Sequence, residues 1–310
     1  MVGVGTLKAA VKEQPRLQEL ARATARTTGR LTASARMTPS FLIVGAQRCG
    51  TTSMYKTLSQ HPLVLPAVLH KGAHYFDTGY GHGPAWYRGH FPLRASARLA
   101  SARLASARRG SPAAGRLPIT GESSPYYMFH PLAGQRIATD LPGVKLLVLL
   151  RDPVERAYSA HAHETARGFE TEPFERALEL EPTRLAGEEA KLIADPTYDS
   201  FSHQHHAYVT RGRYADQLRR LEKLFGRDRI HVIDSQRFFT DPEPVFAEVV
   251  DFLGLGPASG IVFSKHNARP RSAMPDPLRR RLSDQLADSD ADLETWLGAP
   301  PSWRVESPGW

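Results

Sequence analysis

Residues 41–58, FLIVGAQRCGTTSMYKTL, constrain the fold of this chain more than any other stretch. FLIVGA is a short, continuously apolar run, which is typical of a strand buried on both faces of a parallel sheet. A glycine turn follows, and TTSMYKTL then predicts a helix that ends before His61-Pro62. A strand, a turn and a helix N-terminus in this order direct backbone N–H groups and the helix dipole at one point, where an oxyanion can bind.

The turn has the glycine spacing of the triphosphate-binding loop G-x-x-x-x-G-K-[ST], with Gly45 and Gly50 as its glycines. Thr51 stands where that loop carries lysine, which argues against magnesium-assisted triphosphate chemistry. Arg48 places a cation inside the turn instead. We therefore expect the whole turn to bind a phosphate group. The residues concerned are Gln47, Arg48, Cys49, Gly50, Thr51, Thr52 and Ser53.

Strands and helices alternate along most of the remaining sequence. Further strands are predicted by LVLPA, ITGE, GVKLLVLL and RIHVIDSQRF, and helices by VERAYSAHAHETARG, GRYADQLRRLEKLFG and PEPVFAEVVDFLGLG. This alternation predicts a P-loop-like, three-layer α/β/α fold with a central, mostly parallel sheet. We expect one domain over residues 39–300, with an Ala/Arg/Ser low-complexity insertion at 95–116 and a C-terminal tail at 301–310.

The formal net charge of +8 is concentrated in two segments. Residues 1–40 contain seven Lys/Arg and two Glu, and residues 91–118 contain six Arg and no acid. The rest of the chain is therefore slightly acidic, which argues against a basic face that binds nucleic acid. We expect residues 1–38 to form a basic, mobile arm, with a weak contact to a membrane surface as the alternative.

The single cysteine, Cys49, leaves no internal disulfide and predicts a reducing, cytoplasmic location. Because Cys49 lies at a predicted helix N-terminus, we expect the pKa of its thiol to be lowered. No apolar run approaches the roughly 18 residues that a membrane-spanning helix requires. The N-terminal residues also lack an apolar stretch of signal-peptide length.

A second phosphate-binding cluster is predicted in LLVLLRDPVERAYS. Arg151 ends a buried strand, which is the edge where open α/β sheets bind ligands, and Ser159 lies about two turns into the next helix. An Arg fork and a hydroxyl group can hold a phosphate. Asp152 is alternatively interpreted as a magnesium-binding acid. Two phosphate sites at neighbouring strand ends indicate a nucleotide with two separate phosphate groups.

These stretches resemble the sulfotransferases that use 3′-phosphoadenosine 5′-phosphosulfate (PAPS). FLIVGAQRCGTTSMYKTLSQHP is similar to their 5′-phosphosulfate loop, and LLVLLRDPVERAYSAHAHE to their 3′-phosphate strand and helix. KGAHYFD resembles the K-E-x-H-[FY]-F-D segment of the heparan-sulfate type. The stretches GESSPYYMFHP, GFE, GRYADQL and FLGL occur in the expected order, so the resemblance extends over roughly residues 40–300.

The resemblance implies a role for each cluster. Residues 47–53 would hold the 5′-phosphosulfate, and Arg48 would stabilise the charge on the leaving phosphate oxygen. Arg151 and Ser159 would hold the 3′-phosphate, and in-line transfer would proceed without a metal. Arg271, or alternatively Arg269, in KHNARPRSAM would contact a phosphate from a loop over the cofactor.

The general base is where this sequence departs from the family pattern. Gly72 stands where relatives carry the glutamate that accepts the acceptor's proton. His74 is the first candidate to replace it, because an imidazole has a pKa near neutrality, and Glu122 is the second. Alternatively, Gly72 marks a homologue that binds the nucleotide without turnover, which a gain of activity in Gly72→Glu would support. A magnesium-dependent kinase or NTPase is the other rival.

The expected reaction is sulfuryl transfer to a hydroxyl or an amine of a carbohydrate, glycolipid or small metabolite. No motif identifies the acceptor or the oligomeric state, because specificity in such folds resides in variable loops. The histidines of FSHQHHAY have no cysteine or carboxylate at ligand spacing, which favours a packed or solvated helix face over a metal site. They are His203, His205 and His206.

Overall fold

The computed structural model describes residues 26–107, 116–266 and 272–304. Its centre is a five-stranded sheet in the order β2-β3-β1-β4-β5, in which every neighbouring pair is parallel. The predicted α/β fold with a central parallel sheet is confirmed. The strands are β1 (Phe41–Gly45), β2 (Val64–Pro66), β3 (Ile119–Ser123), β4 (Lys145–Leu150) and β5 (Ile230–Asp234).

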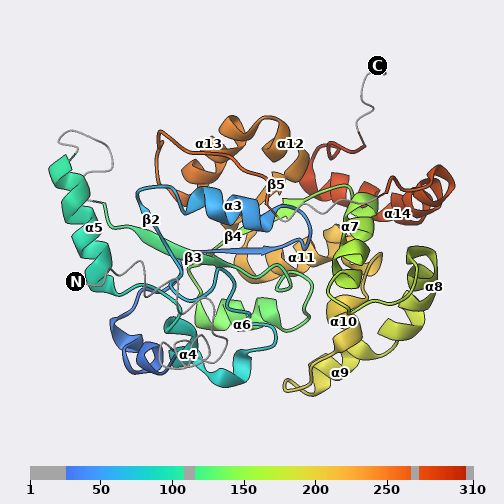
Figure 1. The fold of residues 1–310 in the computed structure, drawn as a ribbon, viewed down its shortest axis with the longest axis horizontal. Helices are drawn as coiled ribbons and strands as arrows, with labels where there is room; N and C mark the ends of the chain where they lie inside the picture. The colour runs from blue at the N-terminus through green and yellow to red at the C-terminus, as the bar shows by residue number, and fades with distance from the viewer. Residues whose placement is uncertain (1–25, 108–115, 267–271, 305–310) are drawn as a thin grey trace, which may run out of the picture.

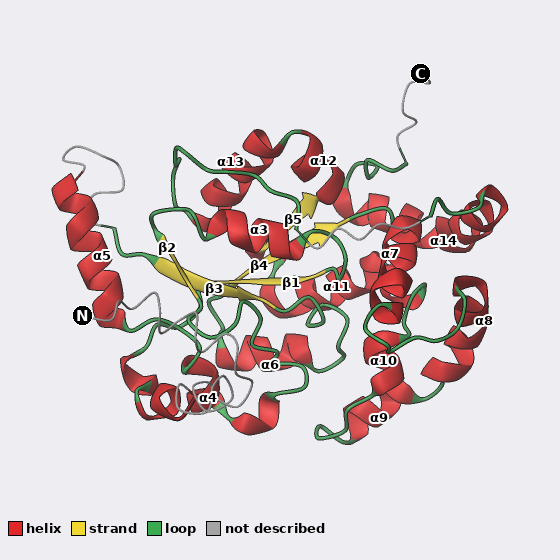
Figure 2. Ribbon diagram, in the orientation of Figure 1, coloured by secondary structure: helices red, strands yellow, loops and turns green. Residues whose placement is uncertain are grey.

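Helices cover both faces of the sheet and also gather beyond the carboxyl ends of its strands (Figures 1 and 2). One face carries α3 (Thr51–Leu58), α12 (Ser235–Thr240) and α13 (Pro242–Leu253). The other face carries α4 (Pro84–Arg88), α6 (Ala133–Asp140) and α11 (Tyr214–Phe225). Beyond the strand ends lie α7 (Pro153–Thr165), α8 (Phe174–Leu185), α9 (Glu188–Ala194), α10 (Phe201–His205) and α14 (Asp276–Leu297).

The central strands are buried because both faces of the sheet are covered. All five residues of β1 are buried, and so are all residues of β4 except the first. This explains why both read as continuous apolar runs rather than as alternating patterns. The amphipathic helix α11 packs against the sheet through a stripe of buried residues. The helix ends before Gly226, as predicted. The stripe includes Leu218, Leu221 and Phe225.

The fifth strand is shorter than the sequence predicts. RIHVIDSQRF was expected to be one strand, but β5 ends at Asp234 and α12 begins at the next residue. The cause is the side chain of Asp234, whose Oδ1 accepts hydrogen bonds from the backbone N–H groups of Gln236 and Arg237 at 2.8 and 3.1 Å. Such a cap stabilises a helix start within an otherwise apolar run.

Folded structure begins before Pro39, so the predicted boundary of the basic arm is too late. Met37 belongs to the main core, and Ala33 is also buried. Arg36 forms an antiparallel bridge with Leu93, and its Nη1 donates a hydrogen bond to a neighbouring backbone carbonyl. The Arg/Ala-rich composition of this segment made it resemble a mobile arm, although a few apolar residues attach it to the core. Residues 1–25 of the predicted arm lie outside the described residues.

The repeat region forms α5 (Arg94–Ala107), a largely exposed helix at the opposite end of the molecule from α14 (Figure 1). Residues 108–115 of the predicted insertion lie outside the described residues. Residues 26–31 are helical, and the described structure also contains single 3₁₀ turns. They are η1 (Ala33–Ala35), η2 (Tyr80–His82), η3 (Thr210–Gly212) and η4 (Arg227–Arg229).

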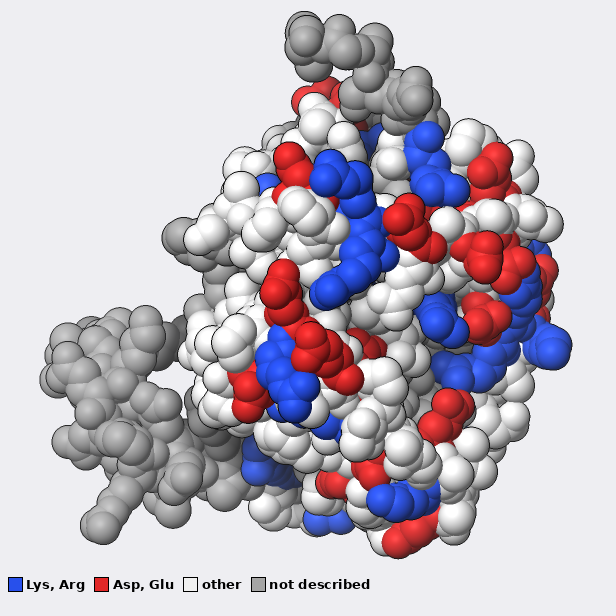
Figure 3. Space-filling model, turned by 90° about the vertical axis from the view of Figure 1, so that its right-hand side faces the viewer, with Lys and Arg blue, Asp and Glu red and all other residues white. Residues whose placement is uncertain are grey.

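The charged side chains do not form one continuous basic area on the face that Figure 3 shows. Lys and Arg are interspersed there with Asp and Glu across the described residues. Among the described residues, no helix combines the length and apolarity needed to cross a membrane.

Candidate active site

The candidate site lies at the carboxyl edge of the sheet, where three neighbouring strands end together. β3, β1 and β4 are adjacent and parallel, so the segments that follow them meet at this edge. These segments are the turn before α3, the Glu122–Ser124 stretch and the start of α7. Loops at such an edge form the usual ligand site of open α/β sheets.

The turn between β1 and α3 has the backbone of an anion-binding loop. Gly50 precedes α3 with a φ of 88°, and Arg48 has a φ of 72°. A Cβ at Gly50 would also lie 2.9 Å from the Phe239 ring, so both its conformation and its surroundings require glycine. The first N–H groups of an α-helix have no partner within the helix, and the residues at the start of α3, Thr51 and Thr52, line the cavity beside the turn.

A cavity of 510 Å³ adjoins this turn and combines both predicted phosphate clusters. Arg48 Nε donates a hydrogen bond to Ser159 Oγ at 3.1 Å, so residues assigned to separate phosphates are in contact. Arg151 lines the same cavity and forms an ion pair with Glu155 at 3.0 Å. The predicted site residues on the cavity wall are Arg48, Gly50, Thr51, Thr52, Arg151 and Ser159.

Three other predicted residues of the turn are engaged elsewhere. The Gln47 side chain donates to Glu164 Oε1 at 3.2 Å and accepts a hydrogen bond from the buried Arg211. The buried Ser53 hydroxyl accepts the backbone N–H of His266 at 2.9 Å. These contacts fix the turn to α7 and to the segment around His266. The third residue is Cys49, which is fully buried under the turn.

The predicted lowering of the Cys49 pKa is wrong. Burial raises the pKa of its thiol to about 11, and the nearby guanidinium of Arg156 offsets this only in part. The Sγ atom lies 3.8 Å from the Tyr214 hydroxyl, inside the core. Desolvation of the thiolate therefore outweighs the helix dipole and the neighbouring cations.

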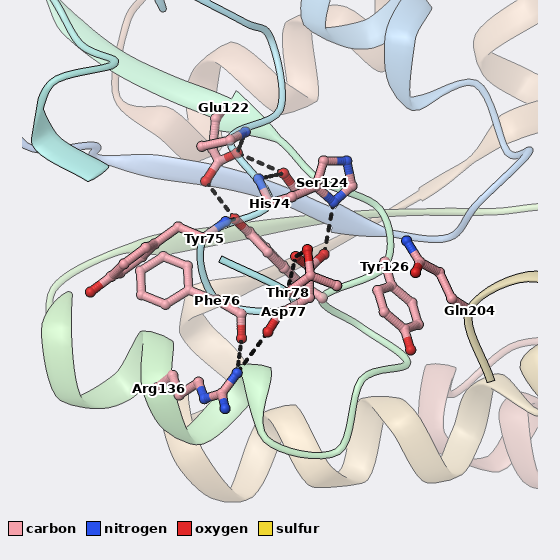
Figure 4. A network of polar contacts seen from close by, with 12 residues as sticks. His74, Tyr75, Phe76, Asp77, Thr78, Glu122, Ser124, Tyr126, Arg136 and Gln204 are labelled. Atoms are coloured by element: carbon pink, nitrogen blue, oxygen red, sulfur yellow. Dashed lines mark hydrogen bonds and ion pairs between the residues drawn. The ribbon is translucent and has the colours of Figure 1, made fainter. Parts of the chain in front are cut away.

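His74 forms a hydrogen-bonded pair with Asp77. Its Nδ1 lies 2.8 Å from Asp77 Oδ2, and the Asp77 side chain is fully buried, whereas 46% of the His74 side chain is exposed (Figure 4). Burial alone would lower the pKa of His74. The hydrogen bond to Asp77, with the charges of Asp77 and Glu122, outweighs that effect and raises the pKa above its ordinary value. The second ring nitrogen, Nε2, faces away from Asp77.

Glu122 is the buried anchor of the segment that carries His74. One carboxylate oxygen accepts the Ala73 N–H at 2.6 Å and the Ser124 hydroxyl at 2.7 Å. The other accepts the hydroxyls of Tyr127 and Tyr87 at 2.9 and 3.0 Å. All four contacts come from the protein interior, and burial raises the pKa of the Glu122 carboxyl. Glu122 thus holds the backbone beside His74 rather than facing the cavity.

The neighbouring amides continue this arrangement. The His74 N–H donates to the Ser124 hydroxyl at 3.1 Å, and the Tyr75 N–H donates to the Tyr127 hydroxyl at 2.8 Å. Three consecutive amides are therefore bound to Glu122, either directly or through one hydroxyl (Figure 4). This support stabilises the left-handed backbone of His74, whose φ is 52°.

Gly72 packs directly on the neighbouring strand. A Cβ at this position would lie 2.4 Å from the Ser123 carbonyl oxygen, which is too close for any side chain without a backbone shift. The residue therefore has a packing role in this chain. For the same reason Gly72→Glu is a poor test of whether the chain is catalytic, because a loss of folding would obscure the result.

The other histidines have packing partners. His203 is buried, stacks on Phe129 and shares a 2.7 Å hydrogen bond with Tyr126, while His205 Nδ1 lies 2.9 Å from Glu164 Oε2. Within residues 26–107, 116–266 and 272–304, no three His, Cys, Asp or Glu side chains are grouped as metal ligands. His206 shares a hydrogen bond with a backbone carbonyl.

Sequence reasoning missed part of the cavity wall. Lining residues come from α12 and, near the C-terminus, from Trp303, where no local motif marks a ligand site. The capping residue Asp234 was the one sequence signal that α12 follows directly on the end of a strand. Arg271 and Arg269 lie outside the described residues. The missed residues include Ser235, Gln236, Phe239, Thr240 and Trp303, whereas Lys265 and His266 belong to KHNARPRSAM, the stretch expected over the cofactor.

The fold and the cavity define a P-loop-like α/β protein with a cavity at the carboxyl edge of its sheet, lined by the turn before α3 and the start of α7. The sulfotransferase domain family matches residues 38–267, which is most of the chain. The chain therefore belongs to the sulfotransferase family.

Individual relatives agree with this assignment. A sulfotransferase structure from Alicyclobacillus acidocaldarius is 30% identical, with a TM-score of 0.57 over 84% of this chain and 96% of that one. The membrane-associated sulfotransferase kil1 of Dictyostelium discoideum is 23% identical over 86% of this chain and 66% of its own length. Human heparan sulfate glucosamine 3-O-sulfotransferase 5 is 28% identical over 71% of this chain, which spans 54% of that relative's length.

Proposed function

We propose that this chain transfers a sulfuryl group from PAPS to a hydroxyl or an amine of a carbohydrate, glycolipid or small-metabolite acceptor. One observation carries the proposal: Arg48 in the turn before α3 and Arg151 directly after β4 line the same cavity, and Arg48 contacts Ser159, which lines it as well. Membership of the sulfotransferase family supports PAPS as the donor.

The residues of the cavity fit such a donor, which carries a 5′-phosphosulfate and a separate 3′-phosphate. The start of α3, with Arg48 and the hydroxyls of Thr51 and Thr52, offers donors for the 5′ group. Arg151 and Ser159 offer a guanidinium and a hydroxyl for the 3′ group. The cavity volume of 510 Å³ lies within the range of about 300–1,000 Å³ that is usual for ligand pockets.

Arg48 has the chemistry needed to stabilise the leaving group. As the bond between the sulfuryl group and the phosphate breaks, negative charge develops on the bridging phosphate oxygen. A guanidinium fixed in the turn by its bond to Ser159 neutralises that charge without reorganising. The adjacent helix N-terminus adds a positive partial charge at the same place.

His74 is the general base in this proposal. Its Nε2 would accept the proton of the acceptor while the Asp77 carboxylate holds Nδ1 and stabilises the imidazolium that forms. Glu122 then has a positioning role, because its four hydrogen bonds hold the backbone around His74. The His74–Asp77 pair favours catalysis over nucleotide binding without turnover, despite the absence of a glutamate at Gly72.

The acceptor class rests on analogy with the relatives, of which one is named for heparan sulfate glucosamine. Because the chain spans only part of the curated relatives' lengths, its acceptor has to be established directly. A cytoplasmic location and a membrane-surface contact through the N-terminal residues remain predictions.

The test is transfer of ³⁵S label from PAPS to a panel of sugars, glycolipids and phenols in the presence of EDTA. We expect labelled product with the wild type and a loss of about 10²–10⁴-fold in His74→Ala, as is typical for removal of a general base. His82→Ala, which changes an exposed histidine, is the matched control. Tight PAPS binding with no labelled product from any acceptor would support the non-catalytic alternative.

A further inference from the structure

Two carboxylates line the proposed donor cavity, where a polyanionic nucleotide would bind. They belong to Asp152 and Glu155, which follow Arg151 at the start of α7. Glu155 Oε2 lies 3.0 Å from Arg151 Nη2, so it occupies the guanidinium assigned to the 3′-phosphate. Without compensation, these acids would repel the nucleotide and compete with it for Arg151.

A cation from a distant part of the sequence compensates both acids. Arg279, in the first turn of α14, places Nη1 3.4 Å from Asp152 Oδ2, and its Nη2 forms an ion pair with Glu155 Oε1. The other oxygen of Asp152 accepts the Val154 N–H at 2.9 Å and caps α7. Glu155 is thus shared between two arginines, one on the cavity wall and one on α14.

The position of Arg279 is fixed by apolar packing rather than by the ion pairs. Leu278, Leu282 and Leu286 recur every four residues along α14 and are buried. They belong to the same apolar cluster as Val154 and Ala157 of α7. This contact holds the first turn of α14 beside the first turn of α7, where both acids lie.

The residues after α14 also reach the cavity. Trp303 lines it, and the Trp303 indole N–H donates a hydrogen bond to Asp290, a buried residue of α14, at 3.0 Å. The ring also lies edge-on to Tyr214, whose hydroxyl donates to the Arg151 carbonyl at 2.9 Å. Both Arg279 and Trp303 lie beyond residue 267, where the match to the sulfotransferase domain ends.

We propose that residues 276–304 are part of the donor site and that Arg279 is a positioning residue for the 3′-phosphate. By taking up the carboxylates of Asp152 and Glu155, Arg279 leaves the Arg151 guanidinium to the nucleotide. The inference rests on the proposed function, because it assumes a ligand with a 3′-phosphate. Its specific consequence is that the effect of Arg279 depends on that phosphate group.

The experiment is calorimetry on the full chain with two probes, adenosine 3′,5′-bisphosphate and AMP, which lacks the 3′-phosphate. We expect Arg279→Gln to weaken binding of the bisphosphate about tenfold, and of AMP less than about twofold, as removal of one partly screened charge near a single phosphate would do. Adding Glu155→Gln to this variant should restore bisphosphate binding to within about threefold of the wild type. Arg280→Gln removes the same charge from an exposed position one residue away and should change neither affinity.

The outcomes separate this inference from the function on which it rests. A wild type that does not prefer the bisphosphate to AMP would overturn both. A wild type with that preference, combined with an Arg279→Gln variant that weakens both probes equally or neither, would overturn the inference alone. So would a double variant that stays weak. If melting curves show that Arg279→Gln is unfolded, Glu155→Gln alone decides: it should bind the bisphosphate about threefold more tightly, and unchanged or weaker binding contradicts the proposal.

Discussion

Replacing Glu122 with alanine should destabilise the whole domain, because the carboxylate accepts four buried hydrogen bonds. Each buried donor left without a partner costs about 1–3 kcal/mol. The Ala73 N–H cannot turn toward another acceptor, whereas the three hydroxyls can reorient in part. Burial raises the pKa of Glu122, so the alanine variant is also relieved of a desolvation cost. We therefore expect a loss near the lower end of the sum, about 4 kcal/mol of unfolding free energy.

Guanidinium unfolding of Glu122→Ala measures this loss, with Glu175→Ala at an exposed helical position as the control. Because domains of this kind are stable by only about 5–15 kcal/mol, the change is large and readily measured. Hydrogen exchange of the peptide over residues 70–78 adds a local readout, since its amides depend on Glu122. A loss below about 1 kcal/mol, or a large loss without faster exchange over 70–78, would refute the assigned anchoring role.

Three further predictions follow from the site. Asp77→Asn removes the negative charge that helps to raise the pKa of His74 and leaves at most a neutral hydrogen bond, so the acid limb of the kcat/KM profile should move to lower pH; a limb that stays in place would exclude His74 as the titrating base. Arg48→Ala should lower kcat about 10²–10³-fold with a smaller change in KM, and an equal loss in binding would contradict a role in transfer. Because burial raises the pKa of Cys49 to about 11, the native thiol should resist iodoacetamide at pH 8 and react once the chain is unfolded, as read by mass spectrometry.

The sequence was most informative where a local pattern and the fold agree. The apolar runs of β1 and β4 predicted buried parallel strands, and their polar ends predicted the two clusters that line the cavity. Both inferences depend only on strand burial and on the carboxyl edge of a parallel sheet. The sequence alone therefore predicts that Arg48 and Arg151 lie near each other.

Other features depend on tertiary packing that no local pattern encodes. Arg279 contacts two acids of the cavity wall because leucines of α14 pack on α7, and Trp303 lines the cavity itself. Nothing in their immediate sequence indicates a ligand site. The pKa of Cys49 was predicted in the wrong direction because burial beneath the turn outweighs the helix dipole. Glu122 was predicted as a base from its place at a strand end, but its side chain turns inward to four donors.

The central claim is that the cavity at the end of β1 and β4 binds a nucleotide with a 3′-phosphate for sulfuryl transfer. Calorimetry with adenosine 3′,5′-bisphosphate against ATP plus Mg²⁺, on the wild type and Arg151→Ala, tests it most directly. We predict a clear preference of the wild type for the bisphosphate and a loss of about tenfold or more in Arg151→Ala, because a charged hydrogen-bonding partner of the phosphate is removed. Tight ATP binding with no preference for the bisphosphate, or an Arg151→Ala variant with unchanged affinity, would contradict the claim.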